Sequence, residues 1–81
     1  MAIKVKFFGS VRERIGQSNC SIDGAGISNV ADVWARATEG TAHGSDVIDD
    51  LYCSVNLEHR EIDYTVNDGD EVAFFPPVTG G

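Results

Sequence analysis

Apolar and polar residues alternate near both ends of the chain, and this alternation predicts β-strands. In residues 3–8 the apolar side chains Ile3, Val5 and Phe7 share one parity, as a half-buried strand requires, and Phe8 is the exception on the polar face. Residues 71–75 form a second apolar run, which follows an Asp-Gly-Asp turn signal at 68–70 and stops before a proline pair. The pattern therefore predicts a first strand at 3–8 and a last strand at 71–75.

The middle of the chain changes to the helical period. Apolar residues recur there at i, i+3, i+4 and i+7: Val30, Val33, Trp34 and Ala37. Ser28 or Asn29 is the expected N-cap, and Gly40 is the expected end of the helix. We expect this single long helix to cover one face of a sheet, with Trp34 in the core.

Shorter segments complete the predicted domain. We expect a strand at 18–22 in a hairpin with the first strand, a strand at 51–57, and a turn or short edge strand at 58–63. The predicted inward residues of these later segments are Cys53, Val55, Leu57, Ile62 and Val66. Residues 11–16 are predicted to be a loop with at most one helical turn. The order of hairpin, helix and further strands predicts an α+β domain with a helix on one face of a mixed sheet.

Length limits what the domain can do alone. A chain of 81 residues buries one modest core and leaves no room for a large substrate cavity, so we expect no complete active site within it. No apolar run approaches the roughly 20 residues of a membrane span, and no signal-peptide pattern opens the sequence. We therefore expect a cytoplasmic protein without membrane contact.

The formal net charge of -7 argues against nucleic acid as a partner, because phosphate binding needs clustered Lys and Arg. An acidic surface suits a basic protein partner instead, and it would steer the encounter more than it adds affinity. The alternative is that the charge serves only solubility.

Cysteine and histidine spacing predicts no metal site. Cys20 and Cys53 are interpreted as reduced thiols within or beside strands, with a reactive thiol pair as the alternative. The spacing of His43, Asp46 and Asp49 matches no ligand pattern, so a solvated loop is the interpretation for that segment.

The last six residues, 76–81, form a predicted tail that follows a domain at 1–75. Pro76 and Pro77 favour the stiff polyproline II form, and six extended residues reach at most roughly 20 Å. Gly80 and Gly81 carry no Cβ, so the terminal carboxylate could pass through a slot too narrow for other residues. Such a group suits acyl activation, in which another protein adenylates it and a sulfide, thiol or amine then attacks. The alternative is a frayed end or an expression scar.

Two aromatic residues are predicted on the face of the sheet that the helix leaves open. If Val72 and Phe74 face the helix, Phe75 shares the opposite face with Phe8. Adjacent exposed aromatics beside the tail predict a partner-docking patch, and ordinary surface scatter is the alternative. His59 is expected near the rim of this face, without an assigned role.

The C-terminal segment Asp-Gly-Asp-Glu-Val-Ala-Phe-Phe-Pro-Pro-Val-Thr-Gly-Gly, residues 68–81, resembles the sulfur-carrying subunits of molybdopterin synthase, a ubiquitin-like β-grasp family. The resemblance extends to residues 3–16 and 54–57, and residues 24–50 carry little of it. It implies a β-grasp fold in which the first and last strands lie parallel at the sheet centre.

The resemblance also implies a mechanism at Gly81. An E1-like enzyme, using its own ATP and Mg²⁺, would adenylate Gly81, and a sulfurtransferase donor would supply sulfur to form a thiocarboxylate. Val78 and Thr79 would contact the channel of the large synthase subunit, and sulfur would pass to cyclic pyranopterin monophosphate. The catalytic residues would lie in that large subunit, within a heterotetramer, and this chain would bind no cofactor of its own.

Two related functions remain open from the sequence. A ubiquitin-like protein modifier would use the same activation but join Gly81 to lysine. A sulfur carrier for thiamin thiazole synthesis has a similar fold and ending, although it generally lacks the proline pair.

Overall fold

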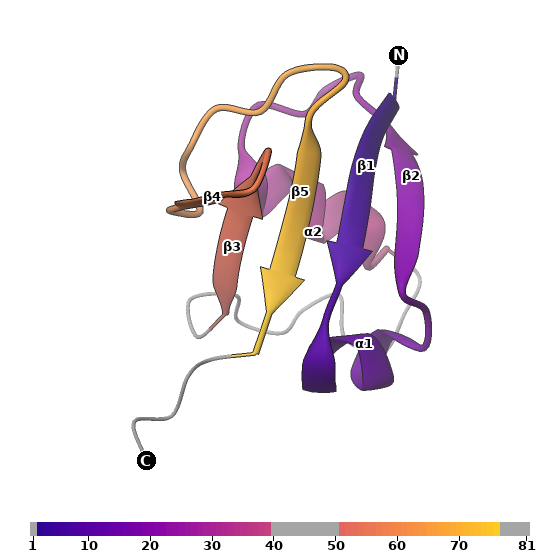
Figure 1. Cartoon of the computed structure of the whole chain (residues 1–81). Helices are drawn as coiled ribbons and strands as arrows, with labels where there is room; N and C mark the ends of the chain where they lie inside the picture. The colour runs from indigo at the N-terminus through magenta and orange to yellow at the C-terminus, as the bar shows by residue number, and fades with distance from the viewer. Residues whose placement is uncertain (1, 40–50, 77–81) are drawn as a thin grey trace.

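The computed structural model describes residues 2–39 and 51–76, which form a mixed five-stranded sheet with a helix across one face (Figure 1). Strand order in the sheet is β2-β1-β5-β3-β4. The elements in chain order are β1 (Ala2–Phe7), α1 (Gly9–Ile15), β2 (Asn19–Asp23), α2 (Val30–Ala37), β3 (Tyr52–Val55), β4 (Glu58–Arg60) and β5 (Glu71–Phe75). This arrangement confirms the expected β-grasp architecture.

The first and last strands pair in parallel at the centre of the sheet, as the resemblance implies. Val5 lies opposite Val72, and Phe7 lies opposite Phe74. β2 and β3 then pair antiparallel on either side of this central pair, and β4 extends the sheet beyond β3. The two strands nearest the ends of the chain are therefore held by the middle of the sheet.

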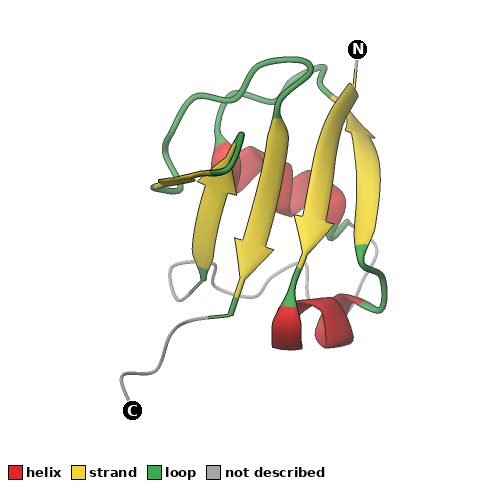
Figure 2. Cartoon of the chain, viewed as in Figure 1, coloured by secondary structure: helices red, strands yellow, loops and turns green. Residues whose placement is uncertain are grey.

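The core lies between the sheet and α2, which crosses behind the strands in Figure 2. The predicted inward residues of β1 and β5 are all nearly inaccessible, and Trp34 of α2 is only 5% exposed. Trp34 meets the Phe74 ring edge-on with centroids 5.0 Å apart, and Phe7 stacks on Phe74 at 6.2 Å. The prediction of Trp34 as a core anchor is confirmed.

Capping side chains define the start of α2. The Asn29 side chain accepts a hydrogen bond of 2.9 Å from the Asp32 N–H, and an Asp32 carboxylate oxygen accepts one of 2.9 Å from the Ser28 N–H. This confirms Asn29, one of the two predicted residues, as the N-cap. The helix ends at Ala37 with Thr38 as its C-cap, and the predicted stop, Gly40, lies outside the described residues.

The prediction of a loop at 11–16 was wrong, because a two-turn helix, α1, begins at Gly9. Val11 is buried and Ile15 packs against the core, so the two apolar residues of this segment share one face at i and i+4. Gly16 ends the helix in a left-handed conformation with φ of 88°, and its N–H donates to the Arg12 carbonyl at 2.9 Å. Charged residues between the apolar ones obscured this short helix in the sequence.

The predicted strand at 51–57 is too long at its end. β3 stops at Val55, and Asn56 and Leu57 have positive φ values of 53° and 73°, which make a two-residue hairpin turn into β4. Leu57 is 85% exposed, so its assignment as an inward residue was wrong. The inward assignments of Cys53, Val55 and Val66 are confirmed, and Ile62 packs against the core while half-buried.

Candidate functional site at the base of the tail

The point where β5 ends is fixed by contacts with the start of α1. The Phe8 N–H donates to the Phe74 carbonyl at 3.1 Å. Gly9 has φ of 57°, and a Cβ added there would lie 2.9 Å from Cγ of Pro76. Only glycine combines this left-handed backbone with such close approach. The first residue of the predicted tail is therefore packed against the turn between β1 and α1.

An aromatic row crosses the open face of the sheet at this end. Phe8 stacks on Phe75 with centroids 4.8 Å apart and rings 5° from parallel. Tyr52 of β3 lies opposite Phe75 in the strand register. Tyr52 in turn meets His59 of β4 edge-to-face, with centroids 5.6 Å apart. We call these four residues, Phe8, Phe75, Tyr52 and His59, the aromatic row.

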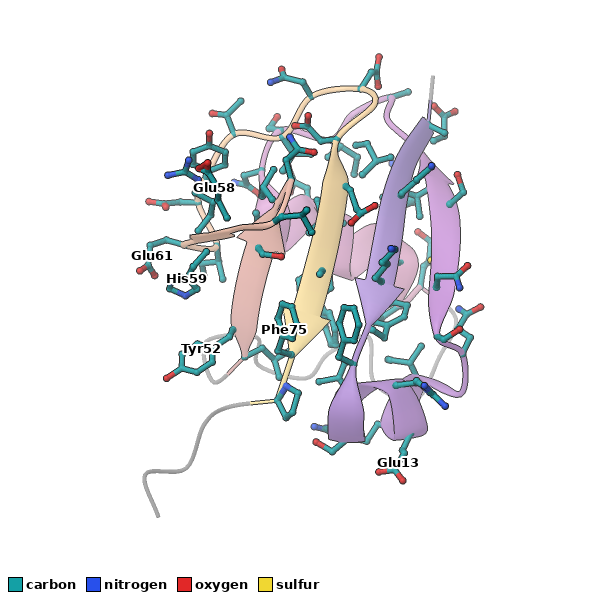
Figure 3. The ribbon with its side chains drawn as sticks, viewed as in Figure 1. Glu13, Tyr52, Glu58, His59, Glu61 and Phe75 are labelled. Atoms are coloured by element: carbon teal, nitrogen blue, oxygen red, sulfur yellow. The ribbon has the colours of Figure 1, made fainter. Side chains whose placement is uncertain are left out.

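The row is open to solvent and borders a hollow. Phe8 is 42% exposed, Tyr52 is 43% exposed, and Phe75 is half-buried because its ring lies against Phe8. A hollow of about 590 Å³ is lined by Tyr52, His59, Phe75 and Pro76. Figure 3 shows Tyr52, His59 and Phe75 on one side of the sheet, beside the end of β5. The surface next to the tail is therefore concave and mainly apolar.

The structure brings together the two predicted docking residues but describes only the first residue of the predicted tail. Phe8 and Phe75 share the open face as expected, and Phe8 is exposed whereas Phe75 is half-buried. The other tail residues, Pro77, Val78, Thr79, Gly80 and Gly81, lie outside the described residues. Their roles, and docking by Phe8 and Phe75, stay predictions.

Sequence reasoning missed two residues of this site, Gly9 and Tyr52, and assigned no role to His59. Gly9 follows a Phe-Phe pair directly, and a glycine after a strand is a signal for a special backbone conformation. Tyr52 precedes the inward residue Cys53, so alternation places Tyr52 on the open face. Its position opposite Phe75 depends on a long-range strand register. His59 was placed on this face correctly, yet its ring contact could not be derived from the chain alone.

The two thiols are poor nucleophiles in this fold. Burial raises the pKa of the Cys20 thiol. Burial, with a smaller effect from the charge of Glu61, raises the pKa of Cys53 to about 11. Both cysteines are free in the structure, as predicted. Because a thiol attacks as its thiolate, neither group is activated for sulfur chemistry near neutral pH.

Other chemistry finds little support in the described residues. No group of three or more His, Cys, Asp or Glu side chains there could hold a metal ion, and His43, Asp46 and Asp49 lie outside this part of the chain. Neither helix within 2–39 and 51–76 has the length and apolar character needed to cross a membrane.

Comparison with known proteins matches nearly the whole chain to one family. The model of the ThiS family matches residues 5–81. The molybdopterin synthase sulfur carrier subunit of Escherichia coli K12 is 38% identical over 89 residues, covering 98% of this chain and 99% of the relative. The subunit of the same name from Haemophilus influenzae is 31% identical over 88 residues, with the same coverage.

Solved structures share the fold across nearly the whole chain. A putative molybdopterin converting factor subunit 1 from Pyrococcus furiosus has a TM-score of 0.77 at 26% identity, covering 96% of this chain and 99% of that one. The small archaeal modifier protein 1 of Haloferax volcanii has a TM-score of 0.74 at 27% identity, covering all of both chains. A chain in the complex of subunits 1 and 2 of the Helicobacter pylori molybdopterin-converting factor has a TM-score of 0.63 at 22% identity, again over all of both chains.

The mixed five-stranded sheet with a helix across one face is the ubiquitin-like β-grasp fold, which the solved neighbours share. The chain belongs to the ThiS family, and within it is homologous to the sulfur carrier subunits of molybdopterin synthase.

Proposed function

We propose that this chain carries sulfur for a molybdopterin synthase as a thiocarboxylate on Gly81. The single observation that supports this best is the homology to the Escherichia coli sulfur carrier subunit, which covers 98% of the chain. The sulfur would be delivered to cyclic pyranopterin monophosphate in the synthesis of molybdopterin.

The proposed chemistry begins at the Gly81 carboxylate. An oxygen of this group attacks the α-phosphorus of ATP in an E1-like enzyme, which holds Mg²⁺, and pyrophosphate leaves. Sulfur at the sulfide level, supplied by a sulfurtransferase, then attacks the carbonyl carbon of the acyl adenylate as HS⁻, the bond from this carbon to the phosphate oxygen breaks, and AMP and a proton leave. The product is a thiocarboxylate, whose sulfur is the nucleophile in the next step. This chain contributes the acyl group, and the nucleotide belongs to its partner.

The fixed position of the first tail residue supports this proposal. Pro76 is packed against Gly9, so the tail begins from one fixed point on the sheet. In this proposal Pro77 would extend the spacer, Val78 and Thr79 would contact the channel of the partner, and Gly80 and Gly81 would pass its narrowest part. A pre-organised tail loses less conformational entropy on insertion, which favours binding.

The large subunit of molybdopterin synthase is the proposed partner at the aromatic row. The Helicobacter pylori neighbour was solved in a complex of subunits 1 and 2, and this chain shares its fold. In the proposed complex, Phe8 and Phe75 dock on the large subunit while the tail enters its active site. The same face would serve the activating enzyme at a different time, because both proteins must reach Gly81.

Protein modification is the second candidate function. A solved neighbour at 27% identity is a small archaeal modifier protein, and both functions begin with the same acyl adenylate. A modifier would join Gly81 to lysine side chains of other proteins. Lysine-linked adducts in host extracts would favour this function over sulfur transfer.

The test uses the chain with its activating enzyme, sulfur donor and large subunit. Intact mass should show replacement of one oxygen by sulfur at the C-terminus, and the loaded protein should support conversion of cyclic pyranopterin monophosphate. A variant lacking Gly81, and one extended by one glycine past it, should lose both signals. The control adds the same glycine at the amino end and should keep both. Full activity of the truncated or extended protein would refute the proposal.

A further inference from the structure

The two edges of the sheet differ in how they are protected against pairing with another chain. β4 at one edge is a three-residue strand, and the carboxylates of Glu58 and Glu61 lie along this edge in Figure 3. β2 at the other edge has five residues, contains neither proline nor lysine, and carries one charged side chain, Asp23. Short length, charged side chains and proline are the features that usually protect an edge strand. In the described part of the sheet, β2 is therefore the edge that lacks this protection.

The unpaired side of β2 is formed by alternate residues. Phe7 donates its N–H to the Ser18 carbonyl at 2.9 Å, and hydrogen-bonded and non-hydrogen-bonded pairs alternate along an antiparallel ladder. Three residues of β2 thus direct their backbone N–H and C=O groups away from β1: Asn19, Ser21 and Asp23. The Asp23 carbonyl accepts from Arg36 at 3.2 Å, which agrees with this direction, and a carbonyl oxygen can accept a second hydrogen bond. No described element pairs with this side of β2.

The two faces of β2 have different chemistry. The side chains of Asn19, Ser21 and Asp23 are exposed on the open face of the sheet. Cys20 and Ile22 are half-buried and pack against the core on the face that α2 covers. A further strand beside β2 would have to keep this alternation, and its inward side chains would cover the remaining apolar surface of the half-buried pair.

Charge also differs between the two edges. Residues 2–39, which form β1, α1, β2 and α2, carry five basic and four acidic side chains, whereas residues 51–76 carry one basic and six acidic side chains. Two copies that met at β2 would hold their β4 edges at the far ends of the joined sheet. Two copies that met at β4 would instead bring the carboxylates of Glu58 and Glu61 together. Repulsion between like charges therefore favours contact at β2 over contact at β4.

We infer that β2 is a self-association edge, at which two copies of this chain pair antiparallel and join their sheets into one. One register keeps the open faces together and uses all five residues of β2: Ser21 faces Ser21, and Asn19 faces Asp23 of the second copy. Cys20 and Ile22 of the second copy then form a close non-hydrogen-bonded pair on the side that the helices cover. The contact is isologous, so it closes as a dimer.

The dimer goes beyond the proposed function and leaves the surface used for that function open. The aromatic row runs from the end of β1 toward β4, away from the edge at β2. The two-fold axis would cross the joined sheet between the two β2 strands. The tail bases at Pro76 would therefore lie toward opposite ends of the dimer, and each could be reached separately.

Analytical ultracentrifugation of the full chain from about 5 μM to about 1 mM tests the dimer, since a short edge buries less surface than a standard interface. The wild-type chain should shift from monomer to dimer over this range. Ser21→Pro removes the central N–H, which points away from β1, and should raise the dissociation constant roughly tenfold or more while the sheet stays intact. Ser21→Ala keeps the backbone donor and is the matched control, which should dimerise like wild type.

Disulfide cross-linking tests the register. The Cα atoms of the two Ser21 residues should lie about 5.5 Å apart, within disulfide range, whereas those of the two Asn19 residues should lie more than roughly 13 Å apart. Under mild oxidation, Ser21→Cys should therefore form a disulfide-linked dimer at least about tenfold faster than Asn19→Cys. Both variants keep Cys20 and Cys53, so the native thiols contribute equally to each measurement.

A wild-type chain that remains monomeric at about 1 mM would overturn the inference. A dimer that Ser21→Pro does not weaken would overturn it as well. Circular dichroism establishes whether Ser21→Pro is folded, and if it is not, the cross-linking decides: equal rates for Ser21→Cys and Asn19→Cys would show that the edge of β2 is not the contact. None of these outcomes concerns sulfur loading at Gly81, which the intact-mass measurement tests separately.

Discussion

The two faces of the sheet carry two aromatic clusters built from neighbouring residues, Phe7 and Phe8 at the end of β1 and Phe74 and Phe75 in β5. Phe7 and Phe74 point toward α2 and pack with Trp34, whereas Phe8 and Phe75 point to the open face and stack on each other. Ring contacts are close on both faces, so contact geometry does not distinguish them. What differs is the cover: α2 lies over the first pair, and no described element lies over the second (Figure 1).

Because of this difference, we expect the covered rings to contribute to stability and the uncovered rings to contribute to recognition of a partner. Inner rings lose their entire surface to the fold, and removing one leaves a cavity. Outer rings keep part of their surface in water, where a partner can remove it later. Adjacent positions in one strand should therefore respond to substitution in different assays.

The largest effect is expected from Phe74→Ala. Phe74 is fully buried between Phe7 and Trp34, so its truncation should reduce the free energy of unfolding by about 3–5 kcal/mol. Urea denaturation followed by Trp34 fluorescence measures it. If Phe74→Ala and Phe75→Ala reduced the free energy of unfolding equally, the proposed difference between the two faces would be wrong.

A smaller effect, in a different assay, is expected from Phe75→Asp. The substitution places a carboxylate on the open face and should weaken binding to the large subunit by roughly tenfold to a hundredfold, in the range of interface hot spots. The free energy of unfolding should change by less than for Phe74→Ala. Unchanged binding affinity in a folded Phe75→Asp protein would show that the aromatic row is not the docking patch. Surface plasmon resonance with the immobilised large subunit provides the measurement.

The smallest effect concerns Cys53, which lies on the inner face of β3. Because the fold raises the pKa of this thiol from 9.0 to about 11, the folded state holds the proton more tightly than the unfolded state. The resulting stability is fully present below pH 9 and is lost as pH rises through about 11. The free energy of unfolding should thus fall less steeply in Cys53→Ala than in wild type between about pH 8 and about pH 10.5. Parallel slopes would contradict the assigned pKa.

Local pattern predicted most of the fold because burial follows parity on β1 and helical spacing on α2. Val5 and Phe7 could be assigned to the core from alternation, and Trp34 from helical spacing. The pattern failed at Leu57, where parity continued past a turn that only backbone dihedrals reveal. It also failed at α1, whose two apolar residues are too few to produce a clear helical period.

The site was predictable only in part. Phe8 and Phe75 follow from parity and from the parallel pairing that the family resemblance implied. Tyr52 and His59 join them through the registers of β3 with β5 and with β4, and strand register is a property of the folded sheet. Gly9 and Pro76 lie close together in the fold but far apart in the sequence, so no local signal links the two residues.

The parallel pairing of β1 with β5 sends both strands in one direction, so Ala2 lies at the end of the sheet opposite Pro76 (Figure 1). A fluorophore or affinity handle fused before Ala2 would thus be separated from the aromatic row by the length of the sheet. Immobilisation through the amino end would therefore leave the aromatic row and Pro76 accessible in binding measurements.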